Sequence, residues 1–79
     1  MAMKVRELID RLNRIKASVD AGETPDLAEP LQRVRQRLRE AFGPEQLKAA
    51  LKDDLPAPST LEEDITTLTM EWMQRRGSR

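Results

Sequence analysis

Carboxylates cluster at two places in the chain, and such clusters can move protons or hold a divalent metal ion. Asp53 is followed by Asp54, and Glu62 is followed by Glu63 and Asp64. Paired carboxylates carry out general acid–base chemistry or bind Mg²⁺. Adjacent residues on a helix point about 100° apart, so neither set converges by itself, and no glycine-rich phosphate loop accompanies them. We therefore expect no catalytic residues, no metal site and no cofactor.

Two residue types on which many enzyme mechanisms depend do not occur, because the sequence has no histidine and no cysteine. Neither a Ser-His-Asp nor a Cys-His mechanism can be built from this chain. The absence of cysteine also excludes disulfides, cysteine zinc sites and iron–sulfur clusters. This composition predicts a protein that is not an enzyme.

Four arginines at alternate positions form the most concentrated run of positive charge. A phosphate-binding or acidic-partner surface would use such a run. At about 100° per residue, however, the four divide into two pairs on opposite edges of an apolar stripe. The competing interpretation is a solvated helix whose arginine stems cover the margin of the core. The pairs are Arg33 with Arg37, and Arg35 with Arg39.

The charge balance favours a protein over nucleic acid as the partner. The formal net charge is zero, from 14 basic and 14 acidic residues. Residues 1–42 carry a net charge of +2 (nine basic, seven acidic), and residues 43–79 carry −2 (five basic, seven acidic). Nucleic-acid-binding domains are usually strongly basic, so nucleic acid is the alternative partner.

Methionines and arginines lie together near the end of the chain. Trp72 shares an apolar stripe with the preceding leucines, so we expect it to be buried. Met70 falls on the opposite side of that helix and Met73 at its edge, beside Arg75 and Arg76. Exposed methionine with arginine is typical of binding surfaces. The two interpretations are scattered exposure and contact with another chain.

The elements that position these residues are predicted from apolar spacing. Intervals of three and four predict a helix over 4–21, and Gly22 stands where a left-handed C-terminal cap is common. Its stripe comprises Val5, Leu8, Ile9, Leu12, Ile15 and Val19.

A second helix is predicted over 26–42 and a short third over 44–53. Thr24 can cap the second helix, with Pro25 at its first position, and Leu27 extends its stripe backwards. Pro30 leaves two alternatives open, because proline inside a helix removes a backbone donor. Either the helix starts afresh near Pro30, or a short turn over 25–29 leads into it.

The last helix is predicted over 60–76. Ser59 and Glu62 fit a capping box, and the two arginines near the C-terminal end suit the helix dipole. The alternative is a strand over 67–73, where polar and apolar residues alternate and threonine is frequent. Start and stop signals favour the helix.

These elements predict one helical domain over 1–79, an all-α small helical bundle of three main helices plus one short helix. No stretch approaches the ~20 apolar residues of a membrane span, and no signal-peptide pattern is seen, so we expect a cytoplasmic protein without membrane contact.

A core this small supplies only about 3–5 kcal/mol of folding stability, which favours association with a partner chain. We expect a non-enzymatic protein–protein interaction module: a small adaptor, assembly chaperone or inhibitor, or a self-associating protein. The alternative is a nucleic-acid-binding protein that uses the Arg33–Arg39 helix and the C-terminal arginines. The expected partner-binding residues are Arg33, Arg37, Met70, Met73, Arg75 and Arg76.

Overall fold

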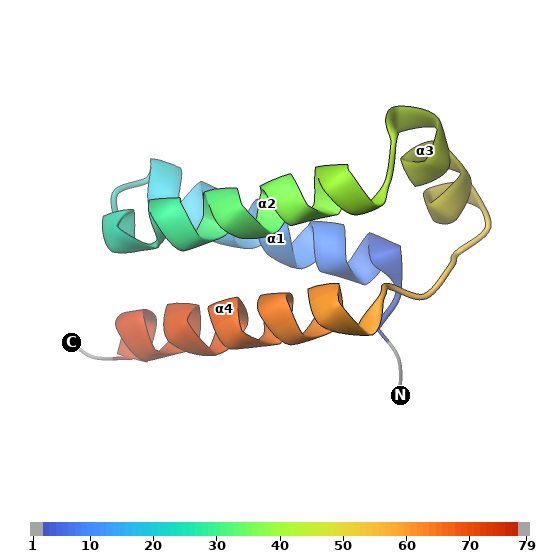
Figure 1. Ribbon diagram of the computed structural model, residues 1–79. Coiled ribbons are helices and arrows are strands. Elements are labelled where there is room, and N and C mark those ends of the chain that lie inside the picture. Colours follow the sequence, from blue (N-terminus) through green and yellow to red (C-terminus); the bar gives the residue numbers. More distant parts are fainter. Residues whose placement is uncertain (1–2, 78–79) are drawn as a thin grey trace.

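The computed structural model describes residues 3–77, and its elements are helical, which confirms the predicted all-α class. In Figure 1, α4 runs parallel to α1 and antiparallel to α2, and α3 lies at one end. None of the described helices is long and apolar enough to cross a membrane. The elements are α1 (Val5–Asp20), the 3₁₀ turn η1 (Pro25–Leu27), α2 (Ala28–Ala41), α3 (Pro44–Lys52) and α4 (Ser59–Gly77).

The core lies between α1, α2 and α4, each of which contacts the other two. The short α3 packs against α1 and contributes Ala50. Apolar residues at helical spacing on the three long helices are buried because their stripes face one another. The buried apolar positions on these helices are Val5, Leu8, Leu12, Ile15, Leu31, Val34, Leu38, Leu61, Ile65 and Leu68.

The first helix ends as predicted, but its buried face is slightly different. Gly22 has a φ of 78°, the left-handed conformation that glycine adopts without a Cβ clash. Its N–H donates to the Val19 carbonyl and that of Glu23 donates to the Ser18 carbonyl, both at 3.0 Å, which is a Schellman cap. The last fully buried residue is Ser18, whereas Val19 is half-buried and packs against the core.

Pro30 is accommodated in the first turn of α2. The single helix expected over 26–42 is divided into η1 and α2, as the short-turn alternative proposed. Because α2 begins at Ala28, Pro30 is its third residue, where a backbone N–H has no partner within the helix. Thr24 precedes η1 but makes no side-chain cap.

Replacing Pro30 tests this placement, because a first-turn proline and an interior proline predict changes of opposite sign in the free energy of unfolding. We expect Pro30→Ala to lower the free energy of unfolding by up to about 1 kcal/mol, because alanine gives the unfolded chain more freedom. A proline in a helix interior would instead cost ~3 kcal/mol, and its removal would stabilise the protein. Urea denaturation measures the change, and clear stabilisation would contradict the first-turn position.

The connection into the last helix is held against the start of the chain. The Val5 N–H donates to the Leu55 carbonyl at 3.0 Å, and the Ala57 N–H donates to the Met3 carbonyl at 2.7 Å. The prolines of this segment have no N–H to donate, so these two bonds of neighbouring residues hold the segment in place. They set where α4 begins.

The helix predicted over 60–76 is confirmed, and the strand alternative over 67–73 was wrong. The helix begins at Ser59, where the Glu62 N–H donates to the Pro58 carbonyl at 2.9 Å. Ser59 is therefore the first helical residue and not the N-cap, so the capping box predicted from Ser59 and Glu62 is not formed. A related bond occurs at α3, where the Gly43 N–H donates to Gln46 Oε1 at 3.0 Å.

Candidate functional site

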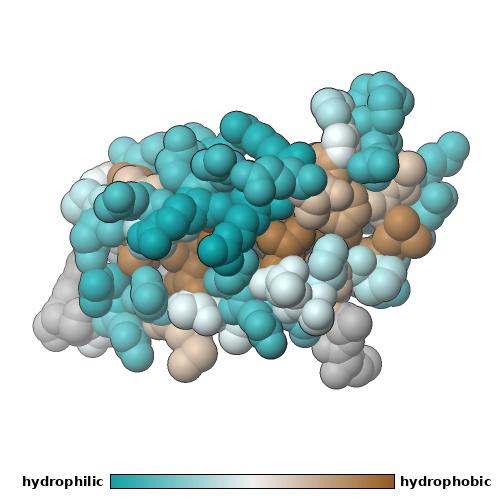
Figure 2. Space-filling view, viewed as in Figure 1, coloured by the Kyte–Doolittle hydropathy of each residue, from teal (hydrophilic) through white to brown (hydrophobic). Residues whose placement is uncertain are grey.

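A groove between α2 and α4 contains two of the predicted partner-binding residues, Arg33 and Arg37. Figure 2 shows apolar surface at its base, between hydrophilic side chains of the two helices. Arg37 Nη1 donates to Asp64 Oδ2 at 2.7 Å, and this bond raises the pKa of Arg37. The groove has a volume of about 240 Å³ and is lined by Pro30, Arg33, Val34, Arg37, Asp64, Thr67, Leu68 and Glu71.

The other two arginines of the run line a different groove, bounded by α1, α2 and α3. The prediction that the four arginines form no single basic face is therefore confirmed. Each pair borders a strip of apolar side chains, as the stripe geometry requires. This second groove has a volume of about 180 Å³ and is lined by Ile9, Leu12, Asn13, Arg35, Leu38, Arg39 and Leu47.

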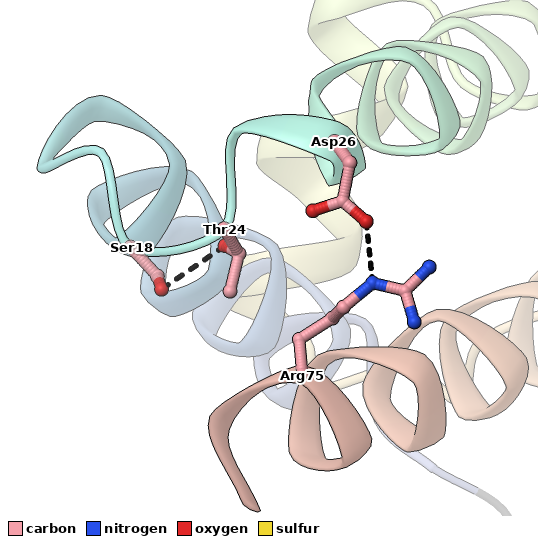
Figure 3. A network of polar contacts seen from close by, with 4 residues as sticks. All are labelled: Ser18, Thr24, Asp26 and Arg75. Carbon is pink, nitrogen blue, oxygen red and sulfur yellow. Dashed lines mark hydrogen bonds and ion pairs between the residues drawn. The ribbon is translucent and has the colours of Figure 1, made fainter. Parts of the chain in front are cut away.

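The C-terminal arginines both contact other parts of the protein. Arg75 Nε donates to Asp26 Oδ2, which joins the end of α4 to η1 (Figure 3). This bond lowers the pKa of Asp26 and raises that of Arg75. The Arg76 guanidinium carbon lies 4.8 Å from the centre of the Trp72 ring, a cation–π distance.

The ion pair between Asp26 and Arg75 predicts a local pH dependence. Because folding lowers the pKa of Asp26, its contribution is fully present above the unfolded-state pKa and is lost as the pH falls through the folded-state pKa. We expect the Asp26→Asn variant to show weaker hydrogen-exchange protection in the last turn of α4 at neutral pH. The two proteins should converge in acid when compared at matched pH, and a constant difference would contradict this origin.

Trp72 packs against the core but is half-buried, so the prediction that it would be buried holds only in part. Its Nε1 is enclosed and has no hydrogen-bond partner among the described residues. The indole lies near the C-terminal end of α4, and Arg76 covers one of its faces. Trp72 is therefore a boundary residue between the core and the surface of α4.

The outward side of α4 carries the two largest exposed apolar side chains of that helix. Met70 is 58% exposed and Met73 is 63% exposed, in agreement with their predicted positions off the apolar stripe. Exposed Thr66 and Gln74 lie in the same sector. We call these four residues, Thr66, Met70, Met73 and Gln74, the α4 outer face.

From Thr66 to Gln74 the α4 outer face has no charged side chain, in a protein with 35% charged residues, and exposed Glu63 lies on the same side of the helix just before it. Between Asp64 and Arg75 the sequence has one charge, Glu71, which lines the groove toward α2. The Thr66 hydroxyl donates to the Glu62 carbonyl at 2.7 Å, so its donor is satisfied within the helix. Pale and light-brown atoms occur along the lower edge of the molecule, over α4 (Figure 2). Met70 and Met73 were among the predicted partner-binding residues, whereas Thr66 and Gln74 were not, although the low charge of this stretch is visible in the sequence.

The acidic residues do not assemble into a metal site within residues 3–77, where no three acidic side chains are placed to hold an ion. Asp64 instead pairs with Arg37. Asp54 has a φ of 54°, a turn conformation that aspartate tolerates better than most residues.

Comparison with known proteins shows no relative from which a role could be inferred. No family model matches the chain, and neither the curated proteins nor the solved structures contain a match. The surface of the protein itself is therefore the basis for assigning a function.

Proposed function

We propose that this protein is a non-enzymatic interaction module that binds another protein, or a second copy of itself, through the α4 outer face. The observation that carries the proposal is the exposure of Met70 and Met73 on a helix face without charge. The cores of protein interfaces are depleted of charged residues and enriched in methionine, aromatic residues and arginine. Arg76 lies on the flank of this face, beyond Met73, and supplies an arginine.

The side chain of methionine is well suited to such contact, because it is flexible and polarisable. Burying the exposed part of each would contribute about 1–2 kcal/mol, by the rule for apolar area. A few buried anchors usually dominate binding, so the two methionines are the main anchors in this proposal. An adaptor, an assembly chaperone and an inhibitor would all act in this way, by occupying a surface of the partner.

Site-specific photo-crosslinking tests the proposal on the whole chain. A photoreactive amino acid at position 70 should give covalent protein adducts in an extract of the native cells, and adding Met73→Lys should abolish them. The matched control places the same group at Gln36, which is exposed on the outward side of α2. Equal adducts at positions 36 and 70, or none at position 70, would overturn the proposal.

Nucleic-acid binding is the alternative, and the arrangement of the arginines offers it less support. The four arginines of α2 are divided between two grooves, and Arg37 and Arg75 are paired with carboxylates. We expect the purified protein to pass through a polyanion column at low salt without retention. Strong retention that falls steeply with salt would indicate phosphate contacts and favour the alternative.

A further inference from the structure

Charge is distributed along α4 with opposite signs at its two ends. Glu62, Glu63 and Asp64 lie in its first turns, and Arg75 and Arg76 lie in its last turn. The α4 outer face lies between them and is uncharged. An antiparallel copy of the same helix is complementary to this pattern, because each acidic end then meets a basic end.

We propose that the α4 outer face binds the same face of a second copy of this chain, with the two α4 helices antiparallel. This inference rests on the proposed function, since it names the partner of that surface. The two-fold axis passes near Met70, so the methionines of the two copies pack at the centre. Met73 of each copy then lies close to Thr66 and Met70 of the other, since all three lie on the same side of α4.

The flanks of the paired helices support this arrangement. A residue that precedes Met70 in one copy faces the residue that follows Met70 by the same number of positions in the other copy. The two helices meet along the same flank. Glu62 and Arg76 lie about 40° apart around α4, at ~100° per residue, on the flank that also carries Met73. Glu62 of one copy is therefore placed within about one helical turn of Arg76 of the other.

A parallel pair would have the opposite electrostatics. Glu62 would face Glu62, and Arg76 would face Arg76, and like charges placed opposite each other suppress association. The helix dipoles also favour the antiparallel arrangement, because the positive end of one α4 lies beside the negative end of the other. The charge pattern therefore selects one orientation.

The size of the surface indicates a weak dimer. A standard interface covers ~800 Å² per partner, about one seventh of this protein's 5589 Å² accessible surface. A face one helix wide covers less than that, and interfaces of this smaller size are typical of transient complexes. We expect dissociation in the micromolar range.

Sedimentation of the purified full chain, from low micromolar to millimolar concentration, tests the proposal. Met70→Lys places two like charges at the axis, and we expect it to raise the dissociation constant by about tenfold or more. The matched control is Gln36→Lys, which adds the same charge on exposed α2 and should leave the constant unchanged. A wild-type monomer at every concentration, or equal effects of both variants, would overturn the proposal.

A charge exchange tests the orientation. Glu62→Arg and Arg76→Glu should each weaken the dimer, and the double variant should recover most of the affinity. Within one chain the two positions are about 21 Å apart along α4, at ~1.5 Å per residue, so recovery reports contact between copies. Circular dichroism checks that each variant remains helical, and a folded double variant without recovery would overturn the antiparallel arrangement.

The two proposals fail in distinguishable ways. If the purified chain stays monomeric while the photoreactive group at position 70 captures a different protein, the second-copy inference is wrong and the proposed function stands. If the purified chain stays monomeric and position 70 captures nothing, both are wrong.

Discussion

Replacing Ile65 by alanine is expected to lower the free energy of unfolding by about 2–5 kcal/mol. Ile65 is completely buried on α4, the helix that packs against both α1 and α2. Alanine would remove apolar contacts and leave a cavity in a core with little spare stability. Because a core of this size supplies only about 3–5 kcal/mol, much of the variant should be unfolded at 25 °C.

Two further variants distinguish packing from a general sensitivity of α4. Ile65→Val removes one methylene and should cost about 0.5–1.5 kcal/mol. Met70→Ala lies on the exposed side of the same helix and should change stability by less than ~0.5 kcal/mol at concentrations where the chain is monomeric. Urea denaturation followed by circular dichroism and Trp72 fluorescence measures all three. If Met70→Ala cost more than Ile65→Ala, the buried and exposed sides of α4 would be wrongly assigned.

Replacing Thr24 by valine is expected to lower the free energy of unfolding by about 1–3 kcal/mol, the penalty for a buried polar group that loses its partner. The Thr24 hydroxyl donates to Ser18 Oγ at 3.1 Å, and both residues are buried (Figure 3). Valine keeps the branched shape but cannot hydrogen-bond. The change therefore isolates the polar contact that joins the loop before η1 to α1.

A double variant provides the control for this pair. Ser18→Ala combined with Thr24→Val removes both hydroxyls, so no buried polar group is left without a partner. Replacing both partners costs less than breaking one contact, and we expect the double variant to be more stable than Thr24→Val alone. Strictly additive losses in urea denaturation would show that the hydroxyls do not act as a pair.

Most of the helix positions and their buried faces could be predicted from local patterns. The spacing of Leu8, Leu12 and Ile15 identified the inner face of α1, and Gly22 identified its end, because both signals depend only on nearby residues. Prediction was weaker at Ser59 and Pro30, where a shift of one or two residues changes which backbone N–H lacks a partner. The buried hydroxyls of Ser18 and Thr24 gave no sequence signal, because their burial depends on their mutual contact.

The exposure of Met70 and Met73 was also predictable, since both lie away from the apolar stripe of their helix. The environment of the arginines was not. Local spacing showed that Arg37 borders the core, but it did not show that Asp64 lies across the groove. Trp72 packs against the core but is only half-buried, which periodicity could not show because it does not reveal where a bundle ends.

The sequence by itself determined the helical class, the inward faces of the helices and the uncharged stretch of α4. These follow from side-chain type and helical spacing, which act over a few residues. The tertiary structure decided which charges meet, as in the pairs Arg37 with Asp64 and Asp26 with Arg75. Such contacts join residues far apart in the chain, so they depend on how the helices pack and not on the pattern within any one of them.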